Sequence, residues 1–86
     1  MERMPINPQR PKKFTWFSLD LDEAVMVMHS MLHDLKHKYR SVYMFIEEND
    51  DLSYTVIAIC SYVRLKKDEV SYLLNELPSF DWESYK

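Results

Sequence analysis

The sequence predicts a small α+β domain built from an antiparallel sheet and two helices. Segments with β-favouring composition alternate along the 86 residues with segments whose apolar residues recur at helical spacing. Hydrophobic residues make up 47% of the chain and aromatic residues 14%, which is enough apolar material for a packed core. Because a chain of this length supports only one such core, we expect a single domain over residues 14–86.

Residues 1–13 differ from the rest in charge and in proline content. They carry four basic residues against one acidic residue, a net charge of +3, while the other residues carry seven basic and thirteen acidic, a net charge of −6. Pro5, Pro8 and Pro11 recur at every third position and exclude a helix there. We therefore expect a flexible basic arm in front of an acidic domain.

The first strand and the first helix follow this arm. Residues 14–19 (FTWFSL) are rich in aromatic and β-branched side chains, which favours a strand. Asp20, with Glu23 three residues later, has the spacing of a capping box and predicts a helix start. The apolar stripe predicted along this helix contains Leu21, Ala24, Val25, Met28, Leu32, Leu35 and Tyr39.

Two further β-favouring segments, residues 41–48 and 53–63, are separated by the sequence NDDL and predict a hairpin. The chain contains no glycine, so we expect Asn49 or Asp50 to supply any positive φ angle that the turn requires. Val70, Leu73, Leu74 and Leu77 then have helical spacing, and Pro78 ends that helix.

The tail, residues 79–86, alternates aromatic with acidic residues and is compatible with a fourth strand or a loose acidic end. The resulting order β-α-β-β-α, with a possible final strand, is that of the ferredoxin-like split β-α-β architecture. In that architecture both helices lie on one face of an antiparallel sheet. Many unrelated functions share it, so the architecture alone does not predict a function.

If two helices cover one face of the sheet, the other face should be open to solvent or to a partner. We expect the helix-facing set to be Phe17, Leu19, Val42, Met44, Ile46, Ile57, Ile59 and Val63. Alternation then places Val56, Cys60 and six aromatic residues on the open face. These six form the predicted partner-binding site: Phe14, Trp16, Tyr43, Phe45, Tyr54 and Tyr62.

Three histidines, His29, His33 and His37, are spaced four residues apart on the first predicted helix. A neighbouring pair has the spacing to chelate one zinc, nickel or copper ion, but nothing in the sequence supplies the further ligands. We interpret them as a solvated helix face and predict no metal site. Metal binding and pH sensing are the alternatives.

Enzyme motifs are missing from the sequence. Without glycine the chain has no phosphate-binding loop, dinucleotide fingerprint or nucleophile elbow. Cys60 lies in an apolar strand, which favours an inert thiol, and Glu47, Glu48, Asp50 and Asp51 are typical of a solvated turn, with a weak divalent-cation site as the alternative. We expect no catalytic residues and no cofactor.

The sequence favours a protein-interaction role: a small acidic regulator, inhibitor or immunity-type module, acting as a homodimer or on a protein partner. A basic or nucleic-acid-binding protein is one candidate for that partner. One alternative is single-stranded RNA stacked on the aromatic face, although the strands offer few cations for phosphate. Another is a small ligand or a metal ion.

The sequence also gives an expectation for location. It has neither an apolar segment long enough to span a bilayer nor an apolar signal segment at its start. The single cysteine cannot form an internal disulfide, which fits a reducing compartment. We therefore expect a cytoplasmic protein with no membrane contact.

Overall fold

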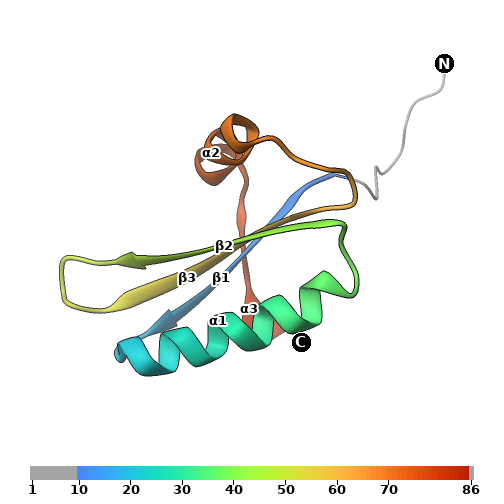
Figure 1. Ribbon diagram of the computed structural model, residues 1–86. Coiled ribbons are helices and arrows are strands. Elements are labelled where there is room, and N and C mark those ends of the chain that lie inside the picture. The colour runs from blue at the N-terminus through green and yellow to red at the C-terminus, as the bar shows by residue number, and fades with distance from the viewer. Residues whose placement is uncertain (1–9, 86) are drawn as a thin grey trace, which may run out of the picture.

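The computed structural model describes residues 10–85 and has an α+β fold, with a four-stranded mixed sheet and three helices (Figure 1). The four strands are β1 (Lys12–Ser18), β2 (Ser41–Glu48), β3 (Tyr54–Ser61) and β4 (Ser79–Asp81). The helices are α1 (Leu21–Lys36), α2 (Lys67–Glu76) and the short α3 (Trp82–Tyr85). The predicted order of elements is confirmed, with α3 as an addition.

The strand order in the sheet is β2-β3-β1-β4. β3 pairs antiparallel with both β2 and β1, as expected for a crossover through α1 followed by a hairpin. β4 runs parallel to β1, so the expectation of a purely antiparallel sheet is wrong at this edge. The fourth strand exists but is only three residues long, and the chain continues directly into α3.

The two longer helices lie on opposite faces of the sheet (Figure 1). α1 packs with Val56, Ala58 and Cys60 of β3, whereas α2 packs through Val70 against Ile59 of the same strand. Successive side chains of a strand point to opposite faces, so these contacts require one helix on each side. The prediction that both helices share one face is therefore wrong, and the protein has three layers.

The start of α1 is fixed by two side chains. Asp20 is the N-cap, and its carboxylate accepts a hydrogen bond from the N–H of Asp22 at 3.3 Å, as the sequence predicts. Glu23 does not complete the capping box, because its carboxylate accepts instead from the Ser18 hydroxyl at 2.8 Å. Ser18 Oγ also accepts from the N–H of Asp20, so it fills the place predicted for Glu23.

The apolar face of α1 is rotated from the predicted stripe. Ala24, Leu35 and the following Tyr39 are buried as expected, but Leu21 is 45% exposed. Met31, which was not predicted, is fully buried. Val25, Met28 and Leu32 are half-buried and lie along one flank of the helix.

The β2–β3 turn uses a residue that the sequence did not predict. Leu52 has a φ angle of 67°, whereas Asn49 and Asp50 do not have positive φ. The N–H of Leu52 donates to the Asn49 carbonyl at 3.1 Å, and the left-handed residue that follows such a turn is normally glycine. Asn49 instead donates from its amide to the hydroxyls of Ser53 and Thr55, both at 3.0 Å.

β1 begins at Lys12, inside the segment assigned to the basic arm, and ends at Ser18. Residues 1–9 of that arm, including Pro5 and Pro8, lie outside the described residues. Within the described range, no helix has the length and hydrophobicity that crossing a bilayer would demand.

Candidate functional site

The six aromatic residues of the predicted partner-binding site do not share one open face. Phe14, Trp16 and Tyr54 belong to the α1 side of the sheet. The Tyr62 ring contacts Tyr39 in a tilted arrangement, with 4.7 Å between ring centroids. Tyr43 and Phe45 belong to the α2 side. The predicted face was wrong for β1 and β3, so a single stacking platform for bases is not formed. Whether any of the six contacts a partner stays a prediction.

The C-terminal segment folds back over Phe14, which is only 1% exposed. The Phe14 ring meets Trp82 edge-on at 5.8 Å and Tyr85 at 4.5 Å between centroids. Trp16 Nε1 donates to Glu83 Oε2 at 2.9 Å. This end of the chain thus covers the aromatic residues of β1 that were expected to bind a partner.

Tyr85 also connects this segment to the loop after α1. Lys38 Nζ donates to the Tyr85 hydroxyl at 3.0 Å, and this hydrogen bond raises the pKa of Lys38. Burial, reinforced by Tyr85, raises the pKa of Tyr39 well above its usual value. Both side chains therefore keep their ordinary charge states at neutral pH.

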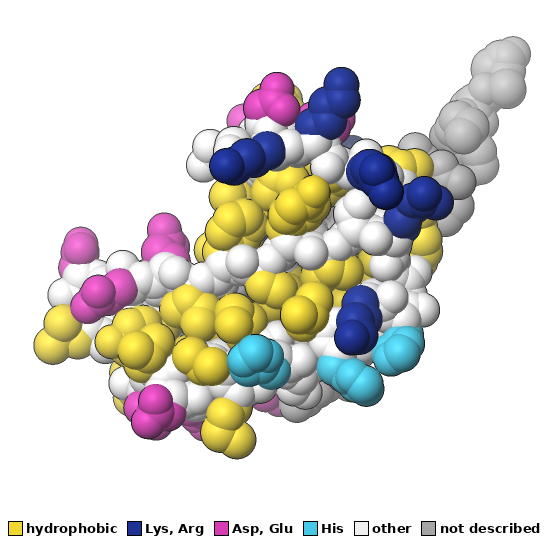
Figure 2. Space-filling model, viewed as in Figure 1, with side chains coloured by type: hydrophobic (Ala, Val, Ile, Leu, Met, Phe, Trp, Pro, Cys, Tyr) yellow, Lys and Arg dark blue, Asp and Glu magenta, His cyan; other side chains and the backbone are white. Residues whose placement is uncertain are grey.

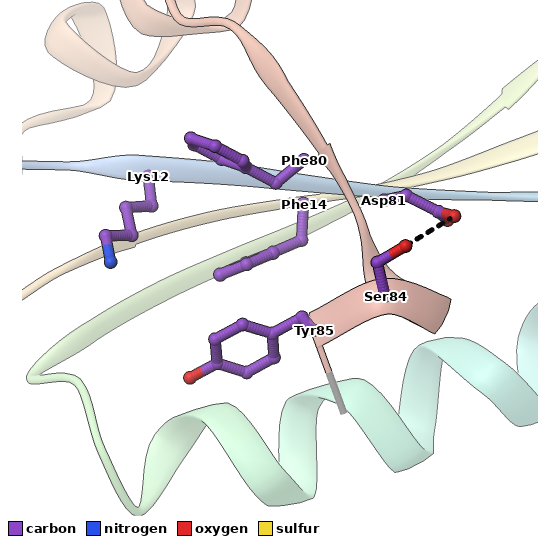
Figure 3. Close-up of a pocket in the computed structure, with 6 residues that line it drawn as sticks. All are labelled: Lys12, Phe14, Phe80, Asp81, Ser84 and Tyr85. Carbon is purple, nitrogen blue, oxygen red and sulfur yellow. Dashed lines mark hydrogen bonds between the residues drawn. The ribbon is translucent and has the colours of Figure 1, made fainter.

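A pocket of about 210 Å³ lies beside the C-terminal segment (Figure 3). Phe14, Phe80 and Tyr85 turn their rings to one side of it, whereas Asp81 and Ser84 point away from the rings and toward each other (Figure 3). Lys12 and the Tyr85 hydroxyl lie on the same side as the rings (Figure 3), but the volume is below the roughly 300–1,000 Å³ of small-molecule sites. The small volume of the pocket does not favour the small-ligand alternative.

α2 covers only one end of its face of the sheet. Beside it lies a shallow groove of about 510 Å³. The floor of the groove is formed by Phe45, Ile57, Thr15 and Thr55, and Lys13 Nζ donates to the Leu74 carbonyl at its rim. Phe45, in the outer strand β2, is the member of the predicted site that lines this groove.

β2 is one of the two edge strands of the sheet, since it pairs only with β3 in the described part of the chain. The N–H of Asn49 donates to the Ser53 carbonyl at 2.8 Å, and this pair continues the β2–β3 register. Hydrogen-bonded and non-bonded pairs alternate in an antiparallel ladder, so odd-numbered residues of β2 bond to β3. The main-chain N–H and C=O groups of Val42, Met44, Ile46 and Glu48 therefore point outward.

The β2 edge has few of the features that protect edge strands. It is eight residues long, contains no proline and no lysine, and its positions 42–46 are all apolar and half-buried. Figure 2 shows apolar side chains gathered over β2 between α2 and α1, with acidic side chains toward the hairpin end and basic side chains and histidines toward the other. We call this strand, with its outward main-chain groups, the β2 edge.

The histidines lie on the solvent side of α1, as predicted. His29, His33 and His37 are all exposed, and the rings of His33 and His37 meet at 5.0 Å between centroids. Among residues 10–85, no three histidine, cysteine or acidic side chains come together as a metal-binding cluster.

In the β2–β3 turn, Asp51 accepts hydrogen bonds from the N–H and hydroxyl of Ser53, which lower the pKa of its carboxyl group.

Cys60 is fully buried, and burial raises the pKa of its thiol to about 12. Only the thiolate reacts with disulfide reagents, so the native protein should hold Cys60 in an unreactive form. At pH 8 we expect a colorimetric thiol reagent to label the native protein at least roughly a hundredfold more slowly than the urea-unfolded chain. Similar rates in the two states would show that this strand opens readily.

The chain matches no protein-family model, no curated protein and no solved structure. The candidate site therefore rests on geometry alone.

Proposed function

We propose that this protein is a non-enzymatic protein-interaction module that binds an extended segment of a protein partner at the β2 edge. One observation carries the proposal: β2 is a long apolar edge strand whose outward main-chain groups have no partner in the described part of the chain. Sequence-independent main-chain bonds would supply affinity, and side chains on the two faces would supply specificity.

The two faces of the β2 edge offer different surfaces to an added strand. On one face, Val42, Met44 and Ile46 continue the apolar layer under α1. On the other, Tyr43 and Phe45 flank the layer under α2, and Phe45 also lines the groove. An added strand with apolar residues on both faces would extend both layers at once, which favours an apolar segment over a polar one.

Charge restricts the partner further. Glu47 and Glu48 are exposed at the end of β2, and Asp50 and Asp51 follow in the turn. A segment that places Lys or Arg opposite this end would gain favourable interactions, and the acidic domain would attract a basic partner over longer distances. The expected ligand is an extended apolar segment with a basic end.

A substitution at Met44 tests the proposal. Met44→Pro removes an outward N–H without removing a bond to β3, whereas Met44→Ala removes the same side chain and keeps the N–H. We expect peptides selected from a random display library against the wild-type protein to bind Met44→Ala and to bind Met44→Pro at least roughly tenfold more weakly, a loss typical of main-chain hydrogen bonds.

Nuclear magnetic resonance adds a second readout. Bound peptides should shift the amide signals of Val42, Met44, Ile46 and Glu48 more than those of Tyr43 and Phe45, because only the former point outward. Peptides that bind Met44→Pro as tightly as Met44→Ala, or a selection that yields no binders, would contradict strand addition at this edge.

A further inference from the structure

We propose that the partner at the β2 edge is a second copy of this chain, paired antiparallel about a two-fold axis at Met44. The inference rests on the proposed function and makes it specific, because it names the occupant and its register. Two-fold pairing of edge strands joins two four-stranded sheets into one continuous sheet of eight strands.

The register follows from the residues of β2. With the axis at Met44, Met44 faces Met44 of the second copy, Val42 faces Ile46, and Tyr43 faces Phe45. Aliphatic side chains thus meet aliphatic ones on the α1 side, and aromatic side chains meet on the α2 side. Moving the axis to Phe45 would instead place the charged Glu48 opposite the apolar Val42. The pairing of like side chains therefore favours an axis at Met44.

Charge supports the same register. With the axis at Met44, Arg40, which immediately precedes β2, faces Glu48 of the second copy, and the symmetric pair forms at the other end. Both residues are exposed and lie at opposite ends of the strand. The acidic hairpin end of one copy therefore meets the basic end of the other, which is the charge separation visible along the molecule in Figure 2.

α1 enlarges the contact beyond the strands. Asp34 of α1 lines a pocket with Trp82 and Tyr85, so it marks the flank of α1 nearest the C-terminal segment. The opposite flank, nearest β2, carries Val25, Met28 and Leu32, which are half-buried. A two-fold axis perpendicular to the sheet brings the α1 helices of both copies to the same side. These side chains then add apolar area to an interface that main-chain bonds alone would leave small.

Sedimentation equilibrium across protein concentrations from about 1 μM to about 1 mM measures the association. We expect wild-type protein to dimerise, Met44→Ala to dimerise more weakly because it loses the side chain at the axis, and Met44→Pro to remain monomeric. Dimers of Met44→Pro as stable as those of Met44→Ala would exclude the β2 edge. A wild-type protein that is monomeric at the highest concentration would refute the second copy, whereas peptide selection decides separately whether the edge accepts a strand.

Charge reversal tests the register. Arg40→Glu and Glu48→Arg each place like charges at both ends of the paired strands, so each variant should dimerise about tenfold more weakly than wild type at low salt. An equimolar mixture of the two variants forms opposite pairs at both ends, and we expect it to regain wild-type association. Failure of the mixture to regain it would refute the axis at Met44.

Net charge needs its own control in that experiment. Lys67→Glu and Glu76→Arg make the same changes of net charge at exposed positions on α2, away from β2. We expect both to dimerise within about twofold of wild type at the same salt concentration. If the α2 variants dimerise as weakly as the β2 variants, the loss comes from repulsion between the net charges of the two copies. That result would overturn the pairing of Arg40 with Glu48.

Discussion

Trp82→Ala is expected to destabilise the protein by about 3–5 kcal/mol, the range for truncating a buried aromatic side chain. Trp82 is 2% exposed and packs against Phe14 and Tyr85, with its ring stacked on Tyr85 at 5.3 Å between centroids. A small domain is stable by only roughly 5–15 kcal/mol, so this one substitution near the end of the chain should remove much of the total. Urea unfolding followed by circular dichroism measures the loss.

Two variants control this result. Trp82→Phe keeps a ring against Phe14 and should lose clearly less stability, which gives a measurable value even if Trp82→Ala does not fold. Phe80→Ala changes an aromatic residue of the same segment that is 48% exposed, and it should cost less than about 1 kcal/mol. Equal losses for Trp82→Ala and Phe80→Ala would mean that the C-terminal segment does not complete the core.

Ile59→Ala is expected to cost about 2–5 kcal/mol by opening the core beneath α2. Ile59 is fully buried and forms the centre of that smaller core with Leu65 and Val70. The α2 side contains only these three buried apolar residues in the described part of the chain, so a cavity here is poorly compensated by neighbours. Urea unfolding again measures the effect, and Val63→Ala, at a 46% exposed position, should change stability by no more than about 0.5 kcal/mol.

Double-mutant cycles separate the two faces. Ile59→Val should couple with Val70→Ala by about 0.5 kcal/mol or more, because both residues belong to the α2 core. It should be additive, within about 0.5 kcal/mol, with Met31→Ala on the α1 side. Coupling of Ile59 to Met31 rather than to Val70 would place both helices on one face, as the sequence predicts.

Periodicity identified the elements well because each has a strong local signal. Strand 41–48 was predicted at its observed bounds, and the end of α2 before Pro78 follows from the restriction that proline places on the residue before it. Asp20 was identified as the N-cap of α1 from its side chain and position alone. These features depend only on residues close together along the chain, so the sequence alone is enough to predict them.

The face of the sheet on which α2 packs could not be predicted in the same way. β3 is apolar on both faces, with Val56 and Ala58 on one and Ile57 and Ile59 on the other, so alternation does not distinguish a covered face from an open one. The sequence analysis treats the face opposite the helices as one open surface, and its aromatic residues then predict a binding site. α2 and the C-terminal segment instead cover most of the aromatic side chains assigned to it.

The candidate site was missed for a related reason. Phe45 and Tyr43 were predicted as binding residues from their side chains, whereas the β2 edge depends on which strand lies outermost in the sheet. That position is set by long-range pairing. The outward main-chain groups of Met44 and its neighbours leave no mark in composition, because every residue except proline carries the same N–H and C=O groups.

The unequal lengths of the two outer strands limit how large an assembly can grow. β4 is three residues long and leads directly into α3, so it offers too little backbone to template another chain. Once two copies join through β2, both ends of the combined sheet are such short strands. In the proposed dimer, growth would therefore stop at two molecules, and the apolar β2 strand would not build fibres.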